Sequence, residues 1–267
     1  METKIQSLRY GLALGKNGVI SLVGAGGKTS LLFRLAHELS ASGDRVLTTT
    51  TTKINPPAKD QSKHLILSPS PAETMNEART LLKVSPHITA AAGYASTPGK
   101  LIGFPPEAIE LFLESNLFHW IIVEADGSSR RPLKAPAPHE PVIPDCTNWV
   151  IGIVGLSALG KPLDKHTVFR PELVSKISGL TEGMKIVGKT LCDVLIHRQG
   201  IFKGTPVGAK QIAFLNQADI PGKEQAGRSI MQCLAQKTNI DLSRVVLGST
   251  LLEPSVLEYH DLHHPSS

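Results

Sequence analysis

A glycine-rich turn near the amino terminus has the composition of a phosphate-binding loop. Residues 19–30 read VISLVGAGGKTS, so an apolar run leads into glycines and then into Lys-Thr-Ser. Glycines let the backbone turn tightly and point several N–H groups at one anion, and a helix beginning there presents its positive end to the same anion. In such loops the lysine reaches the β- and γ-phosphates, and the next hydroxyl ligates Mg²⁺. We therefore expect Thr29 to be a magnesium ligand, Lys28 to be catalytic as well, and the nucleotide phosphates to be bound by Gly24, Ala25, Gly26, Gly27, Lys28, Thr29 and Ser30.

The spacing of this loop departs from the commonest phosphate-loop pattern. That pattern would place a glycine at position 22, where the chain has Leu22. The shorter loop resembles the GxxGKT loop of the Mur ligases and folylpolyglutamate synthetases, which also binds a triphosphate. A plain glycine turn with a surface lysine is the alternative, but the apolar run before the loop and the apolar stripe after it favour phosphate binding.

Two carboxylates follow a second apolar run. Residues 120–127 read WIIVEADG, which places Glu124 and Asp126 at the carboxyl end of an expected strand. Ligands of open α/β sheets collect at this edge, and in phosphate-loop proteins an acid there contacts Mg²⁺ or positions the nucleophile. We expect Glu124 to be a metal ligand and both acids to be catalytic. The alternative is that Asp126 only caps the turn at Gly127.

The segment after these acids is rich in proline and in charge. Residues 124–144 read EADGSSRRPLKAPAPHEPVIP. We expect Arg130, Arg131 and Lys134 to overhang the terminal phosphate and to be catalytic, because arginine forks suit an anionic substrate and phosphoryl transfer. A basic run is also the mark of a solvated face, and that alternative stays open. The same cleft is a candidate location for Lys161, Asp164, Lys165 and His166.

Residues 214–219 read FLNQAD and stand where GTPases carry their NKxD motif, after a late strand. We expect Asn216 to brace a purine pocket and Asp219 to accept two hydrogen bonds from guanine, with Gln217 in place of the lysine. Gly248-Ser249-Thr250 would form a second wall. A simple Asn/Asp turn is the alternative, so the bound nucleotide is GTP or ATP, with GTP favoured.

Five threonines at positions 48–52 end another expected strand and precede Lys53. Strand propensity alone accounts for β-branched residues here. The alternative is that these hydroxyls lie beside the phosphates, with Lys53 as a second cation.

Apolar runs alternate with helix-like segments over the whole chain. Strands are expected at 19–23, 45–49, 64–67, 120–124, 149–154, 211–216 and 245–248, and helices at 30–40, 71–83, 106–115 and 223–236. This alternation predicts an α/β fold, a P-loop NTPase-like and mostly parallel sheet with helices on both faces. We expect one domain over 1–267, with a helical lid or subdomain at 157–204 and a disordered tail at 260–267. That tail makes metal binding by His260, His263 and His264 the less favoured reading.

The composition limits the classes of partner that we expect this protein to bind. The chain has 28 Lys and Arg against 23 Asp and Glu, and only 4% aromatic residues, which argues against base-stacking surfaces for nucleic acid. The three cysteines are far apart, which argues against a disulfide framework, and no apolar stretch has the length of a membrane span. We expect a cytoplasmic protein that binds a purine nucleotide and a small anionic substrate, without nucleic-acid or membrane partners.

Four segments occur in an order that resembles a known family. VGAGGKTSLLFRLA, TTTTTKI, VEADGSSRRPLKAPAPHEPVIP and FLNQAD are similar to the YqeC-type selenium-cofactor biosynthesis proteins, over most of the chain and most specifically in the central block. The resemblance implies an accessory role in maturing selenium-dependent molybdenum hydroxylases, alongside selenophosphate metabolism. A molybdenum hydroxylase or a selenophosphate-pathway protein would then be a partner.

Two functions of different kinds follow from these features. The first is an NTP-dependent enzyme that uses Mg²⁺ and GTP or ATP to activate or transfer a group on a small anionic substrate. The second is a nucleotide-gated chaperone or delivery protein, in which hydrolysis drives a change of shape and no product carries the phosphate. The basic loop favours the enzyme.

Overall fold

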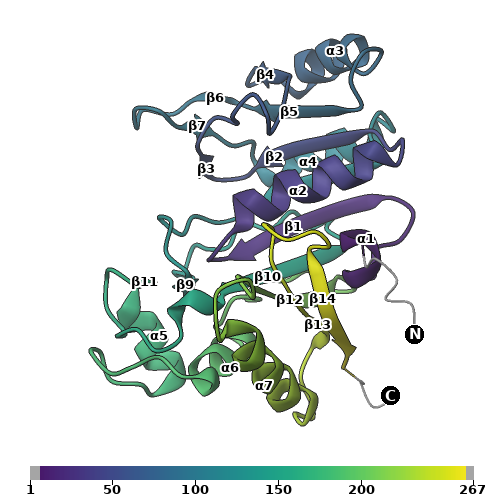
Figure 1. Cartoon of the computed structure of the whole chain (residues 1–267). Helices are drawn as coiled ribbons and strands as arrows, with labels where there is room; N and C mark the ends of the chain where they lie inside the picture. The colour runs from purple at the N-terminus through teal and green to yellow at the C-terminus, as the bar shows by residue number, and fades with distance from the viewer. Residues whose placement is uncertain (1–6, 263–267) are drawn as a thin grey trace, which may run out of the picture.

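A sheet of nine strands organises the molecule (Figure 1). The computed structural model describes residues 7–262. The strand order is β14-β13-β12-β10-β1-β8-β2-β5-β4, and every neighbouring pair is parallel except β13 and β14. The strands are β1 (Gly18–Gly24), β2 (Val46–Thr50), β4 (Leu65–Leu67), β5 (His87–Ala91), β8 (Trp120–Glu124), β10 (Trp149–Gly155), β12 (Lys210–Asn216), β13 (Leu242–Gly248) and β14 (Val256–Asp261).

Helices cover both faces of this sheet, as the sequence predicts. They are α1 (Leu8–Gly11), α2 (Lys28–Ala41), α3 (Pro71–Leu81), α4 (Pro106–Glu114), α5 (Pro171–Ser178), α6 (Gly188–Ile196) and α7 (Lys223–Ala235). Alternate residues of a strand point to opposite faces. In β1, Ile20 and Leu22 pack in the core under α1 and α2, whereas Val19 packs with α3 and α4 and Val23 with α6 and α7. Strands buried on both faces read as continuous apolar runs, which is why the sequence reveals them.

Several short or less apolar elements differ from the sequence-based expectation. The strand β5 reads HITAA, too polar a run to stand out. A second sheet joins β3 (Lys53–Ile54), β7 (Leu101–Ile102) and β6 (Gly93–Tyr94), and a third pairs β9 (Leu133–Lys134) with β11 (Val168–Phe169). A strand of two residues is too short to show a periodic sequence pattern, so the sequence does not predict these strands.

The prediction of a disordered tail from residue 260 is wrong for its first three residues, 260–262, since Leu262 also donates its N–H to the Ser243 carbonyl. His260 and Asp261 belong to β14, which pairs antiparallel with β13 at the edge of the sheet. Arg244 of β13 donates to Asp261 at 2.7 Å, and these paired strands order the chain to this point. His260 lies 3.0 Å from Glu258, whereas His263 and His264 lie outside the described residues.

The helix-rich region at 157–204 packs on the sheet. It begins within the short helix η1 (Leu156–Ala158) and contains β11, α5 and α6. Leu163, Val174 and Leu191 are buried in one cluster with Val150 and Ala213 of the main sheet. The region therefore shares its core with β10 and β12, and its movement as a lid remains a prediction. Among residues 7–262, no helix is long and apolar enough to cross a membrane.

Candidate functional site

The turn between β1 and α2 forms a cradle that only glycine permits. Gly24, Gly26 and Gly27 have φ angles of 91°, 89° and 128°, a region that other residues rarely adopt. A Cβ on Gly26 would collide with the backbone of Gly155, and one on Gly27 with the side chain of Asn216. The helix α2 begins at Lys28 without a side-chain cap, so its first N–H groups are available to an anion.

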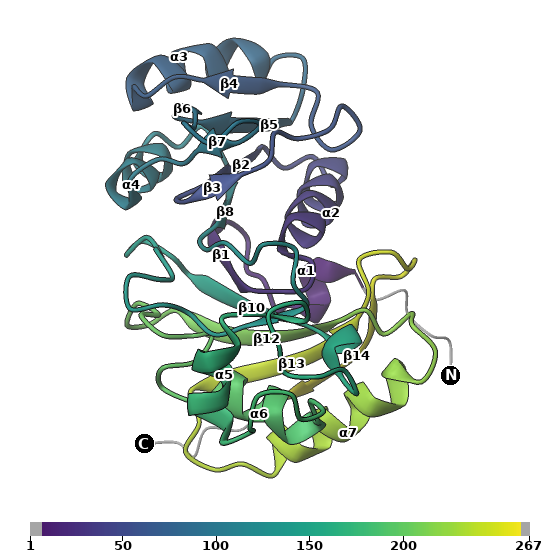
Figure 2. The same cartoon turned by 90° about the vertical axis from the view of Figure 1, so that its left-hand side faces the viewer.

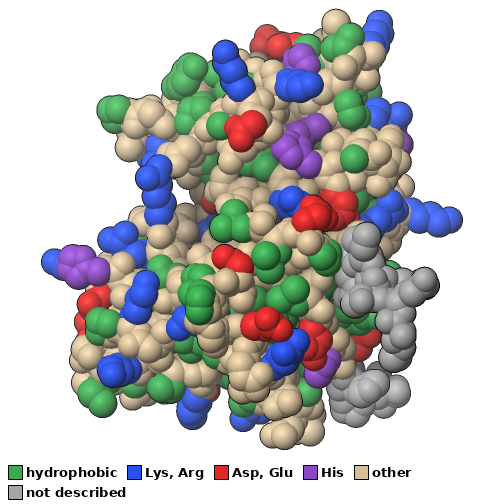
Figure 3. All heavy atoms as spheres, in the orientation of Figure 1, with side chains coloured by type: hydrophobic (Ala, Val, Ile, Leu, Met, Phe, Trp, Pro, Cys, Tyr) green, Lys and Arg blue, Asp and Glu red, His purple; other side chains and the backbone are tan. Residues whose placement is uncertain are grey.

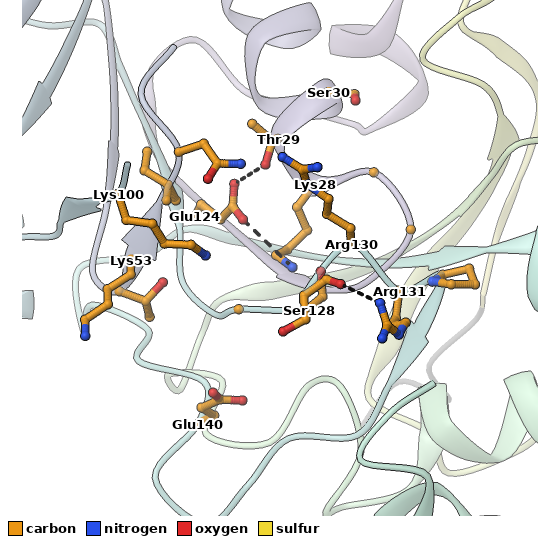
Figure 4. Close-up of a pocket in the computed structure, with 18 of the residues that line it drawn as sticks. Lys28, Thr29, Ser30, Lys53, Lys100, Glu124, Ser128, Arg130, Arg131 and Glu140 are labelled. Atoms are coloured by element: carbon orange, nitrogen blue, oxygen red, sulfur yellow. Dashed lines mark hydrogen bonds and ion pairs between the residues drawn. The ribbon is translucent and has the colours of Figure 1, made fainter. Parts of the chain in front are cut away.

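A hydroxyl and a carboxylate meet directly above this cradle. The strands β1 and β8 are neighbours, and their register pairs Leu22 with Glu124. Thr29 Oγ1 donates to Glu124 Oε2 at 2.8 Å (Figure 4). Burial raises the pKa of the Glu124 carboxyl above its ordinary value of 4.5, although Lys28 and Thr29 act in the other direction. Hydroxyl and carboxylate oxygens are ligands that Mg²⁺ prefers, so a divalent cation fits this pair and would relieve the cost of burying the carboxylate.

Lys28 is held inside the cradle by its neighbours. Its side chain is 1% exposed, with Nζ 3.0 Å from Asp126 Oδ1 and 4.0 Å from Glu124 Oε1, and it donates to the carbonyl of Gly24 at 2.6 Å. The contact with Asp126 lacks hydrogen-bond geometry, so Oδ1 has no hydrogen-bond partner within residues 7–262. Asp126 Oδ2 accepts from the Gly24 N–H at 3.0 Å. Asp126 therefore orders the cradle from behind and does not line the cleft.

Lys134 continues this line of charges away from the cradle. It is fully buried, with Nζ 3.0 Å from Asp126 Oδ2 and donating to Glu140 Oε2 at 2.7 Å. Arg170 donates to both oxygens of Glu140, at 2.7 and 3.1 Å. Burial alone would raise the pKa of Glu140, but the hydrogen bonds and charges of Arg170 and Lys134 outweigh it and lower the pKa to about 2. Lys134 thus lies behind the cleft wall, and its predicted catalytic role has no direct route to a bound ligand.

A cleft of about 1380 Å³ opens above the cradle. Figure 3 shows the hollow between the upper and lower parts of the molecule, with Lys and Arg side chains beside it. The strand β1 points towards this side, which faces the viewer in Figure 2. Its charged lining comprises six cations and two carboxylates: Lys28, Lys53, Lys100, Arg130, Arg131, Lys161, Glu124 and Glu140. The cleft is therefore suited to a polyanion.

Arg130 and Arg131 line this cleft, and their catalytic role stays a prediction. Ser129 and Arg130 have φ angles of 48° and 59°, and Arg131 closes the turn by donating its N–H to the Ser128 carbonyl at 2.9 Å. Two successive non-glycine residues in this region are strained, and this turn presents Arg130 to the cleft. Arg131 Nε is fixed to the Lys165 carbonyl at 2.8 Å.

The other charged candidates near the basic loop divide into two groups. Lys161 and His166 line the cleft, whereas Asp164 and Lys165 do not. Asp164 Oδ1 accepts from the backbone N–H groups of His166 and Thr167, each at 2.9 Å. Asp164 thus fixes the local turn.

The threonine run mostly stabilises the sheet. Thr48 contacts His87 and Thr89 at 3.0 and 2.7 Å, Thr49 donates to the Ala90 carbonyl, Thr50 to Glu124 O and Thr51 to Val142 O. Thr52 and Lys53 line the cleft. The structural interpretation therefore holds for the first four hydroxyls, and the last residues of the run face the proposed ligand.

Asn216 links the cradle to the far strands. Its Nδ2 donates to Gly26 O at 2.8 Å, and its Oδ1 accepts from Thr250 N at 3.1 Å. Gln217 lines the cleft and accepts from Ser157 N at 3.2 Å. Asp219 is exposed and does not line the cleft. Asn216 therefore braces the cradle, and a purine pocket formed by Asn216 and Asp219 stays a prediction.

Sequence reasoning missed Lys100 as part of this site. Lys100 is some seventy residues from the cradle in sequence, and no local pattern marks it. Glu140 stands within the proline-rich block, where the charge density was visible but its partner Arg170 was not.

A glycine cradle between the first strand and a helix, beside a hydroxyl–carboxylate pair at the carboxyl edge of a parallel sheet, defines a P-loop NTPase-like α/β protein. The family model described as "YqeC protein" matches residues 20–172, which include both the cradle and the central block. A protein of Escherichia coli (strain K12), described as "Uncharacterized protein YqeC", is 36% identical over 238 residues, covering 89% of this chain and 90% of that protein. The chain belongs to the YqeC family.

Solved structures of FtsY are more distant. Chloroplast FtsY from Physcomitrella patens is 13% identical with a TM-score of 0.44, and the match covers 96% of this chain and 65% of that one. FtsY from Mycoplasma mycoides is 12% identical with a TM-score of 0.42, covering 94% and 66%. This chain thus spans about two thirds of the FtsY chains that it matches.

Proposed function

We propose that this protein is an enzyme that binds a purine nucleoside triphosphate with Mg²⁺ and uses it to activate or transfer a group on a small anionic substrate. The hydrogen bond from Thr29 to Glu124 carries the proposal. It sets two hard oxygen ligands beside free helix N–H groups, and Mg²⁺ is usually held by few protein ligands together with phosphates.

The chain's own residues supply the remaining parts. The backbone N–H groups of residues 24–30 would bind the β- and γ-phosphates, and Lys28 would exchange Asp126 for a terminal phosphate oxygen. Thr29 and Glu124 would hold Mg²⁺, which neutralises charge on the phosphates when bound. Arg130 and Arg131 would orient the anionic substrate and stabilise charge that develops during transfer.

The family resemblance supports a pathway for this reaction. The central block resembles that of the YqeC-type proteins, which favours a role in the maturation of selenium-dependent molybdenum hydroxylases in the cytoplasm, with a hydroxylase or a selenophosphate-pathway protein as partner. The excess of cations in the cleft favours a negatively charged intermediate as the substrate.

The nucleotide-gated chaperone is the second candidate, and one observation favours it. The chain of ion pairs from Lys28 through Asp126, Lys134 and Glu140 reaches Arg170 at the start of α5. A nucleotide that draws Lys28 away from Asp126 would perturb this chain and so alter the surface around α5.

Calorimetric titration with non-hydrolysable GTP and ATP analogues in Mg²⁺ tests nucleotide binding. Thr29→Ala should weaken binding at least about tenfold through loss of the metal ligand. The matched control is Ser40→Ala near the other end of α2, whose hydroxyl bonds only the His37 carbonyl within the described residues. Equal affinities of wild type and Thr29→Ala would contradict the site.

Phosphorus NMR of the products separates enzyme from chaperone. With hydrolysable nucleotide and selenophosphate, a new phosphorus- or selenium-bearing product supports the enzyme. Release of inorganic phosphate alone, at the same rate with and without selenophosphate, supports the chaperone.

A further inference from the structure

We propose that the cleft holds a second anion of the phosphate-ester class, clamped by Lys53 and Lys100 on the side opposite the basic loop. This inference rests on the proposed function and specifies its substrate as a ligand that carries a doubly charged group. Figure 4 shows the two lysines on one side of the cleft, with Arg130 and Arg131 on the other.

The register of the small sheet places both lysines on one face. Lys53 pairs with Ile102, and Ile54 pairs with Leu101, in an antiparallel ladder. Residues opposite each other share a face and successive residues alternate, so Lys53, Lys100 and Ile102 are directed to one side. Ile54 and Leu101 are buried together, and Ile54 also contributes to the cleft wall beside Lys53 and Lys100. The small sheet therefore holds both lysines at the cleft.

This small sheet is tied directly to the main one. After β7, the N–H groups of Gly103 and Phe104 donate to the carbonyls of Thr52 and Thr50, at 2.6 and 2.9 Å. A Cβ on Gly103 would collide with the Thr50 carbonyl, so only glycine permits this close approach. Phe104 is buried in the core under α4. The two lysines thus stand on an anchored wall, next to the strand that pairs with β8.

The position of Lys100 relates the clamp to the phosphates. Lys100 and Glu124, the carboxylate that we assign to Mg²⁺, both line the cleft (Figure 4). An anion bound by Lys100 would therefore lie on the side of the cleft where the terminal phosphate would be.

The charge of the cleft exceeds what a nucleotide neutralises. Five lining cations stand outside the ion pairs of the described residues, whereas Lys28, Glu124 and Glu140 are each paired. Mg²⁺ offsets part of the negative charge of a triphosphate, so positive charge remains in the cleft for another ligand. A phosphate ester, at about −1.5 to −2 near pH 7, matches this remainder.

The cations concerned have no acidic partners. Within the described part of the chain, no ion pair includes Lys53, Lys100, Arg130, Arg131 or Lys161. The cleft is also larger than the roughly 300–1,000 Å³ of a pocket for one small molecule. Room and unbalanced charge therefore both point to a second anionic ligand.

A two-stage titration tests the clamp. The protein is first saturated with a non-hydrolysable Mg²⁺-nucleotide, which reports on the proposed function by itself. Phenyl phosphate is then added, with benzoate as a singly charged probe of similar shape, and binding is followed by chemical-shift changes in protein NMR. We expect phenyl phosphate to bind at least about tenfold more tightly than benzoate, because its second negative charge adds Coulomb attraction to the two lysines.

Variants identify the residues. The double variant Lys53→Gln/Lys100→Gln should lose at least about tenfold in phenyl phosphate affinity, compared after its own nucleotide affinity has been measured and the nucleotide has been added to saturation. Lys63→Gln, an exposed lysine that does not line the cleft, should keep both. Failure of phenyl phosphate to bind, binding equal to that of benzoate, or unchanged binding in the double variant would overturn the inference.

The two proposals can fail separately. If the nucleotide does not bind in the first stage, the proposed function fails, and phenyl phosphate is titrated into the nucleotide-free protein. Dependence of that binding on Lys53 and Lys100 would still support the clamp, and independence would overturn it.

Discussion

Glu140 is the centre of a buried ion-pair chain, and its removal gives the sharpest test of the structure. The Glu140 carboxylate is 12% exposed, and it accepts hydrogen bonds from Lys134, which is 0% exposed, and from Arg170. We predict that Glu140→Gln destabilises the protein at pH 7, because it leaves Lys134 buried beside Asp126, which Lys28 also contacts. Removing one partner of a buried pair is typically costly, at about 3–5 kcal/mol.

The pKa gives an independent magnitude. A fall from 4.5 to about 2 corresponds to about 3 kcal/mol at pH 7, at roughly 1.4 kcal/mol per unit. Since the folded-state pKa is depressed, this stability is present above pH 4.5 and is lost as the pH falls from 4.5 towards 2, to about 1 kcal/mol at pH 3. In a chain of this size, the loss at neutral pH should lower the melting temperature by roughly 6–12 °C.

Urea unfolding at pH 7 and pH 3 measures both quantities. The control is Glu182→Gln, an exposed glutamate with no ion pair among the described residues, which should change stability by less than about 0.5 kcal/mol. A loss below about 1 kcal/mol for Glu140→Gln at pH 7, or an equal loss at pH 7 and pH 3, would refute the buried ion-pair chain.

Three further predictions concern the proposed chemistry. Lys28→Ala should abolish nucleotide hydrolysis, at a cost on the order of 2–4 kcal/mol of transition-state stabilisation; unchanged hydrolysis in a folded mutant would contradict the cradle assignment. The double variant Arg130→Gln/Arg131→Gln should impair turnover of the physiological substrate and leave nucleotide affinity within about 1 kcal/mol. Full activity of this variant would mean that the two arginines belong to a solvated face and have no role in the site. GTP should bind more tightly than ATP by about tenfold to a hundredfold, and calorimetry of Asp219→Ala should show that preference lost; a preference that persists would mean that the base is read elsewhere.

The sequence predicts the parts of the fold whose burial or backbone geometry requires a recognisable local pattern of residues. The apolar runs at 19–23, 120–124 and 149–154 are visible because a parallel strand is covered on both faces. The cradle is visible because only glycine tolerates its φ angles. By contrast, the strand at 87–91 carries threonine and alanine, and β14 is an edge strand with polar residues, so neither resembles a core strand.

Within the site, the sequence also fails to predict those features that depend on contacts between distant side chains. The sequence brings Glu124 to the cradle because strand ends share an edge, but it gives no sign that Asp126 points behind the loop. Lys134 looks equivalent to Arg131 in the string RRPLK. In the fold, one is buried between carboxylates and the other lines the cleft. In an irregular segment the direction of a side chain depends on its tertiary contacts. Here Asp126 contacts Lys134, and Lys134 contacts Glu140. No periodic pattern in the local sequence predicts either contact.

The resting position of Lys28 relates nucleotide binding to the basic loop. Asp126 is shared by two buried lysines, with Lys28 3.0 Å from one oxygen and Lys134 3.0 Å from the other. Under the proposed function, a triphosphate competes with Asp126 for Lys28, so the lysine exchanges one anionic partner for another and its charge is never buried alone. Asp126 then keeps Lys134 as its cation, which strengthens the hold on the segment from Gly127 to Glu140, since Lys134 also bonds both of these residues. Because Arg130 and Arg131 stand on that segment, occupation of the cradle would stiffen the wall that carries the substrate's arginines.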